Sequence, residues 1–361
     1  MSLNRADERY AWLESSAVRN ASDIALGCIL LAASAAAILD ARNLSFGTWE
    51  QLDDGFFPIL VGCLLAVVGV LLIARGALGR APHMRWKTWQ IVLVVVLYVA
   101  VILGGALFQL LLMAALETLP PAGWFGSVAT VLTRFGPSEW VAFYLLVLSL
   151  AVALARLSRL RAAGMMLLGL LLQIIGLDRI TGQLRLTMGL EQLLAGIDFL
   201  VLAPGLILVA DSMVCLISPA LLLATYTRRI AGWRDPAVSA VVGIVMRVAA
   251  VLVIAAACYL AFRVFERVLD IGLLFVFGAF GVASKAFGWN RLVLLLAFSY
   301  GTLLEESIRQ AMMGWGGDPT LIFWQPVGGT MLAAAGFILV AVLVLSLRRA
   351  LPRNVSSDTT A

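Results

Sequence analysis

Two charged residues, Asp211 and Arg247, stand inside long apolar runs of the sequence. If those runs cross a bilayer, a charge near its centre costs about 2.5–3.5 kcal/mol unless it is paired or hydrated. At 1.5 Å per helical residue the depths of the two residues differ by about 6 Å, which an arginine side chain can span. We therefore predict an ion pair. It is either structural, locking two helices together, or a carboxylate-binding arginine that Asp211 tunes.

Two further sets of charges lie between or at the ends of apolar runs. Arg179 and Arg185 flank a polar loop and could hold an anionic ligand, although Glu191 and Asp198 lie close by in sequence and offer ordinary ion pairing within the loop. The second set is Glu305, Glu306 and Arg309. Glu305 and Arg309 have the i,i+4 spacing of a helix-surface pair, and Glu306 beside them could face a partner protein. A structural role is the simpler interpretation of both sets.

The sequence lacks the residue patterns that metal binding, cofactor binding or catalysis would need. His83 is the only histidine, and it stands in a basic, tryptophan-containing stretch without a second ligand or a nucleophile. The four cysteines show no CxxC or other metal-ligand spacing. The sequence also has no phosphate-binding P-loop and no GxGxxG motif. We therefore expect no metal site, no cofactor and no enzymatic activity.

The composition indicates which elements must position these charges. The chain has 361 residues, of which 62% are hydrophobic and only 13% charged, whereas soluble domains are roughly 45–50% apolar and about 25% charged. Such an excess of apolar residues cannot be buried inside a water-soluble fold, so membrane lipid must surround the protein. The net charge of +5 comes from short basic clusters between apolar runs, which argues against nucleic acid as a partner.

A bilayer core about 30 Å thick needs about 20 apolar residues in a helix. Ten runs qualify, of which the fifth and ninth are short for a full crossing and could be tilted, re-entrant or parts of broken helices. Their ranges are 24–41, 57–74, 89–113, 139–155, 163–177, 199–224, 238–262, 271–287, 291–304 and 327–347.

Lysine and arginine are retained on the cytoplasmic side during insertion, which orients the spans. With residue 1 in the cytoplasm and alternating spans, 18 of the 26 basic residues fall inside and seven outside. The prediction is an all-α, polytopic integral membrane protein with about ten transmembrane helices and both termini cytoplasmic. Its predicted parts are a cytoplasmic segment (1–23), a first membrane domain (24–117), an extracytoplasmic linker (118–138), a second membrane domain (139–350) and a cytoplasmic tail (351–361).

The first membrane domain contains a recognisable start to a helix, Gly55-Phe56-Phe57-Pro58. Proline is tolerated in the first turn of a helix, aromatic residues anchor at the membrane interface, and Gly62 and Gly69 then lie on one face for close packing. This segment resembles the small membrane subunit (TctB) of bacterial tripartite tricarboxylate transporters.

A second likeness covers parts of the other membrane domain. The string from Gly176-Leu-Asp178 through Thr181-Gly182, Arg185 and Gly196-Ile-Asp198 resembles the large membrane subunit (TctA) of the same systems. The stretch 269–347, with Leu304-Glu305-Glu306-x2-Arg309 and Gly316-Gly317-Asp318, resembles the C-terminal end of that subunit. The two Gly/Pro-rich motifs of the type GTxxGxxPGxG that the large subunit carries are not in this sequence.

The resemblance implies a membrane subunit of a binding-protein-dependent secondary transporter for tricarboxylates or related carboxylates. Its implied partners are a complete large subunit and a periplasmic solute-binding protein, its implied location is the bacterial inner membrane, and its mechanism would be alternating access. This chain would support the substrate pathway. The alternative is a non-transporting scaffold or assembly protein derived from transporter parts, which the missing motifs favour.

Overall fold

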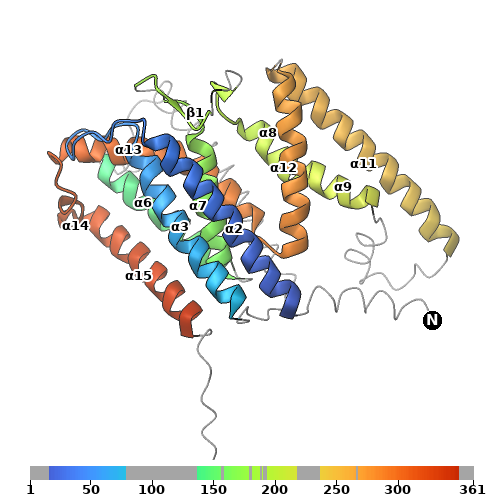
Figure 1. Ribbon diagram of the computed structural model, residues 1–361, viewed down its shortest axis with the longest axis horizontal. Coiled ribbons are helices and arrows are strands. Elements are labelled where there is room, and N and C mark those ends of the chain that lie inside the picture. The colour runs from blue at the N-terminus through green and yellow to red at the C-terminus, as the bar shows by residue number, and fades with distance from the viewer. Residues whose placement is uncertain are drawn as a thin grey trace, which may run out of the picture. The chain divides into compact units, whose positions relative to one another are not determined.

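The computed structural model describes residues 16–78, 136–155, 158–178, 181–187, 189, 193–217, 236–265 and 267–348, and these are mostly helical (Figure 1). The chain divides into two compact units, one formed by residues 1–174 with 292–361 and the other by residues 175–291. The predicted span 89–113 lies outside the described residues, as do most of the 118–138 linker, the first 15 residues and the tail.

Unit 1 is a bundle of long helices. Its described helices are α2 (Ser16–Ala41), α3 (Phe56–Ala77), α6 (Pro137–Leu154), α7 (Arg159–Ile174), α13 (Arg291–Gly314), the single turn α14 (Leu321–Trp324) and α15 (Pro326–Arg348). The first residue of α13, Arg291, is counted with unit 2.

Small residues set the closest contacts of unit 1. A Cβ atom added at Gly69 of α3 would lie 3.0 Å from the carbonyl oxygen of Gly27 in α2, and one at Gly62 would lie 3.0 Å from Ile38. The glycine face predicted from the sequence therefore brings α2 and α3 together. Because Gly27 faces Ile73 while Gly62 faces Ile38, the two helices are antiparallel.

The directions of the other helix pairs follow in the same way. Gly169 faces Leu294 and Gly301 faces Gln173, so α7 and α13 are parallel. Contacts at both ends likewise make α6 and α15 parallel. These are the directions that alternating spans one, two, four, five, nine and ten require. The count of ten spans and the cytoplasmic termini stay predictions.

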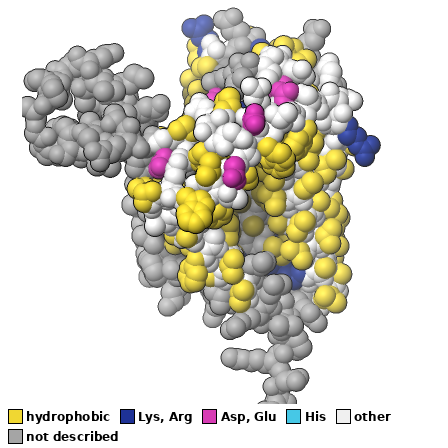
Figure 2. Space-filling view, turned by 90° about the vertical axis from the view of Figure 1, so that its left-hand side faces the viewer, with side chains coloured by type: hydrophobic (Ala, Val, Ile, Leu, Met, Phe, Trp, Pro, Cys, Tyr) yellow, Lys and Arg dark blue, Asp and Glu magenta, His cyan; other side chains and the backbone are white. Residues whose placement is uncertain are grey.

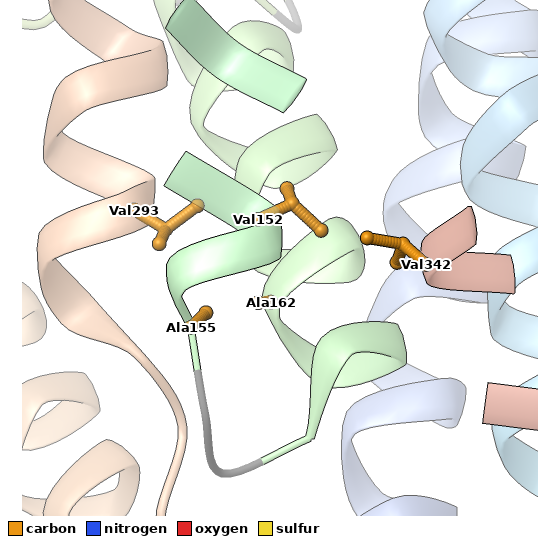
Figure 3. Packing of buried hydrophobic residues seen from close by; sticks show 5 residues of the cluster. All are labelled: Val152, Ala155, Ala162, Val293 and Val342. Atoms are coloured by element: carbon orange, nitrogen blue, oxygen red, sulfur yellow. The ribbon is translucent and has the colours of Figure 1, made fainter. Parts of the chain in front are cut away.

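Unit 1 has a dry cluster at the end where α6 and α15 finish and where α7 and α13 start. Figure 3 shows Val152 and Ala155 from the end of α6, Ala162 from α7, Val293 from α13 and Val342 from α15 pointing toward one another. All five are buried. This cluster fixes four helices at the end that the charge pattern places in the cytoplasm.

The outer wall of unit 1 is apolar. Figure 2 shows apolar side chains covering the visible wall of helices, with the visible acidic side chains gathered above them. On α15, for example, Phe337 is 76% exposed. Apolar side chains on the outside of a helical bundle are typical of a protein whose solvent is lipid.

Unit 2 begins with a short antiparallel ladder of β1 (Gly176–Leu177) and β2 (Leu184–Arg185), in which Gly176 pairs with Arg185 and Leu177 with Leu184. Then come α8 (Phe199–Pro204), the π-helix η2 (Gly205–Val209), α9 (Ala210–Ile217), α11 (Pro236–Phe265) and α12 (Val268–Phe287). Val201, Val209, Ala257 and Leu274 form its core.

Six segments of the described residues are long and apolar enough to cross a membrane: 20–41, 56–77, 137–154, 199–216, 247–264 and 268–287. The predicted short span at 163–177 is α7, which has only 16 residues. The span predicted to end at 304 was wrong in length, because α13 continues to Gly314. The helix extends beyond its apolar run because Glu305 and Arg309 are paired within it.

Candidate functional site

The span predicted at 199–224 is interrupted in its middle. Pro204 has no N–H group to donate along α8, and the chain passes into the π-helix η2 directly after it. Single π-helical turns are rare, and those that do occur are frequently found at functional sites. The short runs 163–177 and 291–304 were the candidates for broken helices, with tilted or re-entrant segments as the alternatives, but α7 and α13 are continuous. The interruption therefore lies in a run that is long enough for a full crossing, and not in either of the two short runs.

Glycines of α12 allow this helix to pack closely against η2. A Cβ atom added at Gly281 would lie 2.4 Å from the carbonyl oxygen of Leu206 and 2.6 Å from the Cβ of Ala210. Since Gly205 faces Leu274 and Gly281 faces Leu206, α12 runs parallel to the interrupted span. The end of α12 is thereby brought level with the start of α9.

Asp211, in the first turn of α9, lies between two cations. Its Oδ1 accepts from Lys285 Nζ at 3.3 Å and from Arg291 Nη1 at 3.2 Å. Arg291 Nη1 also donates to the carbonyl oxygen of Leu206, at 2.9 Å. The side chains of Asp211, Lys285 and Arg291 are 41%, 34% and 19% exposed. The structure thus places a half-exposed cluster of net charge +1 beside the π-helix.

The predicted pair between Asp211 and Arg247 does not form. Arg247 is exposed on α11, and it has no ion pair among the described residues. The prediction compared depths along two unbroken helices. The small residues of α12 instead bring that helix, with Lys285 near its end, against the segment that carries Asp211.

The predicted outer loop folds around one ion pair. Arg185, on β2, is buried against the carboxylate of Asp178, which directly follows β1. Asp198 instead caps α8 by accepting from the N–H group of Leu200 at 2.8 Å. Arg179 and Glu191 lie outside the described residues. Arg185 therefore stabilises the hairpin, and its guanidinium is turned away from solvent.

The Gly-Phe-Phe-Pro motif lies at the start of α3. The N–H group of Gly55 donates to the carbonyl oxygen of Ser45 at 2.9 Å, and a Cβ at Gly55 would approach that oxygen to 3.0 Å. Phe56 makes an edge-to-face contact with Phe46, with ring centroids 5.5 Å apart. Phe57 and Pro58 are buried in the first turn of the helix. The motif thus fixes the connection between α2 and α3.

The residue before this motif, Asp54, is fully buried and joins α3 to α13. Its Oδ1 lies 3.3 Å from Arg309 Nη2, and the same nitrogen donates to Glu305 Oε1 at 2.8 Å. Glu305 and Arg309 thus form the i,i+4 pair that their spacing predicts, and Asp54 extends it across the bundle. Glu306 is half-buried on the same helix. In the turn after α13, the hydroxyl and N–H groups of Thr320 donate to Asp318 and lower the pKa of that exposed carboxyl.

A second buried cluster was missed by the sequence reasoning. Asp23 of α2 is fully buried between Arg75 of α3, whose Nε lies 2.7 Å from its Oδ2, and Arg161 of α7. Arg75 also donates to Ser158 Oγ at 2.9 Å. All these residues adjoin the ends of predicted spans on the same side of the membrane, a signal that could have indicated the cluster.

No group of three side chains suited to a metal ion occurs in the parts of the chain that the structure describes. The charged sites consist only of carboxylates, guanidinium groups and one ammonium group. Such groups can bind ions and hold helices together.

Comparison with known proteins gives a partial family match. Residues 124–228 match the tripartite tricarboxylate transporter TctA family. The match covers less than a third of the chain. The match begins inside the predicted 118–138 linker and covers α6, α7, the hairpin of Arg185 and the interrupted span of Asp211. A transporter-related, multi-pass membrane protein follows from this match together with the apolar helices.

Two curated relatives come from one region of Agrobacterium vitis. An uncharacterized 52.8 kDa protein in the TAR-I ttuC′ 3′ region is 42% identical over 84 residues, which are 23% of this chain and 17% of the relative. An uncharacterized 16.3 kDa protein in the same region is 30% identical over 86 residues, 23% of this chain and 55% of the relative. The chain therefore spans only part of each. No solved structure matches.

Proposed function

We propose that the chain is a membrane subunit of a binding-protein-dependent secondary transporter for tricarboxylates or related carboxylates. The observation that carries this proposal is the match of residues 124–228 to the TctA family. It is supported by partial matches to one large and one small protein of the same region. Two such matches are what a chain combining small-subunit and large-subunit parts would give.

The buried contact between Asp54 and Arg309 supports the same interpretation. Asp54 precedes the motif that resembles the small subunit, and Arg309 belongs to the stretch that resembles the end of the large one. The two residues are 255 positions apart in sequence. A buried pair between the two parts is what a subunit contact brought into one chain would look like.

The proposed role is to support the substrate pathway of a complete large subunit in the bacterial inner membrane. A periplasmic solute-binding protein would deliver the carboxylate, and an ion gradient would drive alternating access. Secondary transporters bind substrate at discontinuous helices near the midplane, and the interrupted span 199–217 is the discontinuous segment here. We propose no catalytic step.

The alternative is a scaffold or assembly protein that transports nothing. The two Gly/Pro-rich motifs of the large subunit are not in the sequence, and the charge clusters at both ends of unit 1 are internally paired. A scaffold needs the helical surface of this chain but no pathway through it.

Labelled citrate uptake separates the two roles. A strain keeping a complete large subunit and a binding protein is compared with and without this chain, and co-purification with the large subunit is measured in parallel. The transport role predicts co-purification and a loss of uptake on deletion, restored by the wild-type chain and by the exposed-site control Glu50→Gln. Co-purification with unchanged uptake would favour the scaffold, and failure of both would reject membership of the complex.

A further inference from the structure

The cluster at the end of α12 holds more cationic charge than its carboxylate neutralises. Lys285 and Arg291 both contact the single carboxylate of Asp211. Arg291 uses one nitrogen, Nη1, for both Asp211 and the carbonyl oxygen of Leu206. Among the described residues, its Nε and Nη2 have no hydrogen-bond acceptor, and Lys285 has no acceptor other than Asp211. Within the part of the chain that the structure describes, these donors are therefore directed at no acceptor.

The connection between α12 and α13 holds the two cations in place. Gly288 ends α12 in the left-handed conformation, at φ 69°. The N–H group of Trp289 then donates to Ser284 O at 2.8 Å, and its buried ring stacks on Phe287 with centroids 5.3 Å apart. Because these contacts fix the turn to the end of α12, Lys285 and Arg291 need little reordering to bind a shared ligand.

The position of the cluster indicates the kind of ligand. The loop between α12 and α13 lies on the side that the charge pattern assigns to the cytoplasm. Farther back along α12, Phe275 and Val276 are exposed apolar side chains, as on a lipid-facing helix. Basic sites between helices at the cytoplasmic face bind the phosphates of lipid head groups.

We propose that Lys285 and Arg291 form a binding site for a phosphate oxyanion, supplied by the head group of an anionic lipid. The guanidinium of Arg291 offers Nε and Nη2 to two phosphate oxygens, and Lys285 adds a point charge. Asp211 occupies part of the site and competes with the ligand. This proposal does not depend on the transport role.

The full-length chain in nanodiscs tests the site. Thermal unfolding is measured in phosphatidylcholine alone, with added phosphatidylglycerol, and with inorganic phosphate. Phosphatidylglycerol should raise the unfolding temperature of the wild type. Arg291→Gln should weaken the lipid affinity about tenfold, since it removes a charged hydrogen bond, and Lys285→Arg should keep it. Asp211→Asn should strengthen the affinity about threefold or more, because the negative charge that competes with the phosphate is lost.

Control experiments distinguish a lipid head group from free phosphate as the source of the oxyanion. Arg263→Gln removes an exposed cation from the last turn of α11. It should leave the lipid response unchanged. A response to inorganic phosphate alone, lost in Arg291→Gln, would keep the oxyanion site with free phosphate as its ligand. The proposal is overturned if neither phosphate source stabilises the chain, if Arg291→Gln responds like the wild type, or if Asp211→Asn weakens binding.

Discussion

At the scale of single residues, the two charge clusters of unit 1 differ in how they are neutralised. Asp23 is one carboxylate between two guanidinium groups, whereas Arg309 is one guanidinium between two carboxylates. Buried charges are tolerated only when paired, since desolvation costs several kcal/mol per ion. In each cluster one central residue pairs with both of the others. Its substitution should therefore lower the stability of the fold more than substitution of one of its partners.

Asp23→Asn should strongly destabilise unit 1. The substitution removes the carboxylate shared by Arg75 and Arg161, and losing one partner of a buried pair costs about 3–5 kcal/mol. Thermal unfolding of the detergent-purified chain measures the loss. The exposed control Glu50→Gln should stay within about 0.5 kcal/mol of the wild type. An Asp23→Asn chain as stable as that control would show that the cluster is not needed for folding.

Arg309→Gln should cost more stability than Asp54→Asn. The first change removes the cation next to the fully buried Asp54, at a cost of about 3–5 kcal/mol. The second leaves Arg309 paired with Glu305 and costs about 1–3 kcal/mol. Denaturant unfolding of both variants under one condition gives the order. The reverse order would mean that Asp54, and not Arg309, is the central residue of this cluster.

At the scale of elements, the interrupted span of unit 2 depends on its neighbour. In an α-helix the N–H group of Ala210 would donate to the carbonyl oxygen of Leu206, whereas at the end of η2 it donates to that of Gly205, and the oxygen of Leu206 accepts from Arg291. Close packing by α12 at Gly278 and Gly281 leaves no space for side chains at those positions. The position of the π-helix is therefore set by contact between helices as well as by Pro204.

Gly281→Ala should destabilise unit 2, and Gly272→Ala on the same helix should not. The added methyl group at Gly281 would collide with backbone at 2.4 Å, and overpacking of this kind costs about 1–3 kcal/mol. Gly272 has nothing within 4 Å of an added Cβ, so alanine there gains up to about 1 kcal/mol of helix propensity. The unfolding temperatures of the two variants, compared with that of the wild type, test this prediction. Equal temperatures would contradict the close approach of η2.

At the scale of the whole molecule, alternation of spans is the main regularity. Within unit 1, α2 and α3 are antiparallel while α7 and α13 are parallel. Within unit 2, the interrupted span and α12 are parallel. These directions match the odd and even positions of the helices among ten predicted crossings. Which end faces the cytoplasm is predicted only from the distribution of lysine and arginine.

Cysteine labelling tests that orientation. In a chain with its four native cysteines replaced, Glu50→Cys between α2 and α3 should react in intact cells with a membrane-impermeant maleimide. Leu78→Cys, just after α3, should react only after the cells are opened. Both positions are exposed, so access to the reagent is the only difference. Labelling of Leu78→Cys in intact cells, with Glu50→Cys protected, would reverse the topology.

Much of the architecture can be predicted from the sequence. Apolar runs locate the described helices to within a few residues at most ends, because lipid selects uninterrupted apolar segments. The i,i+4 spacing predicts the Glu305–Arg309 pair, and the glycine spacing predicts the α2–α3 contact. These are local properties, set by neighbours along one helix or by the solvent around it.

The amino-acid sequence by itself determined that the protein is helical, lies in a membrane and carries most of its charges outside its apolar runs. Only the tertiary structure decided which charges meet. Asp211 pairs with Lys285 and Arg291 instead of Arg247, and Asp54 reaches Arg309 across the bundle. The physical reason is that depth along a helix follows from counting residues, whereas the face presented to a neighbour depends on how small residues let the helices approach.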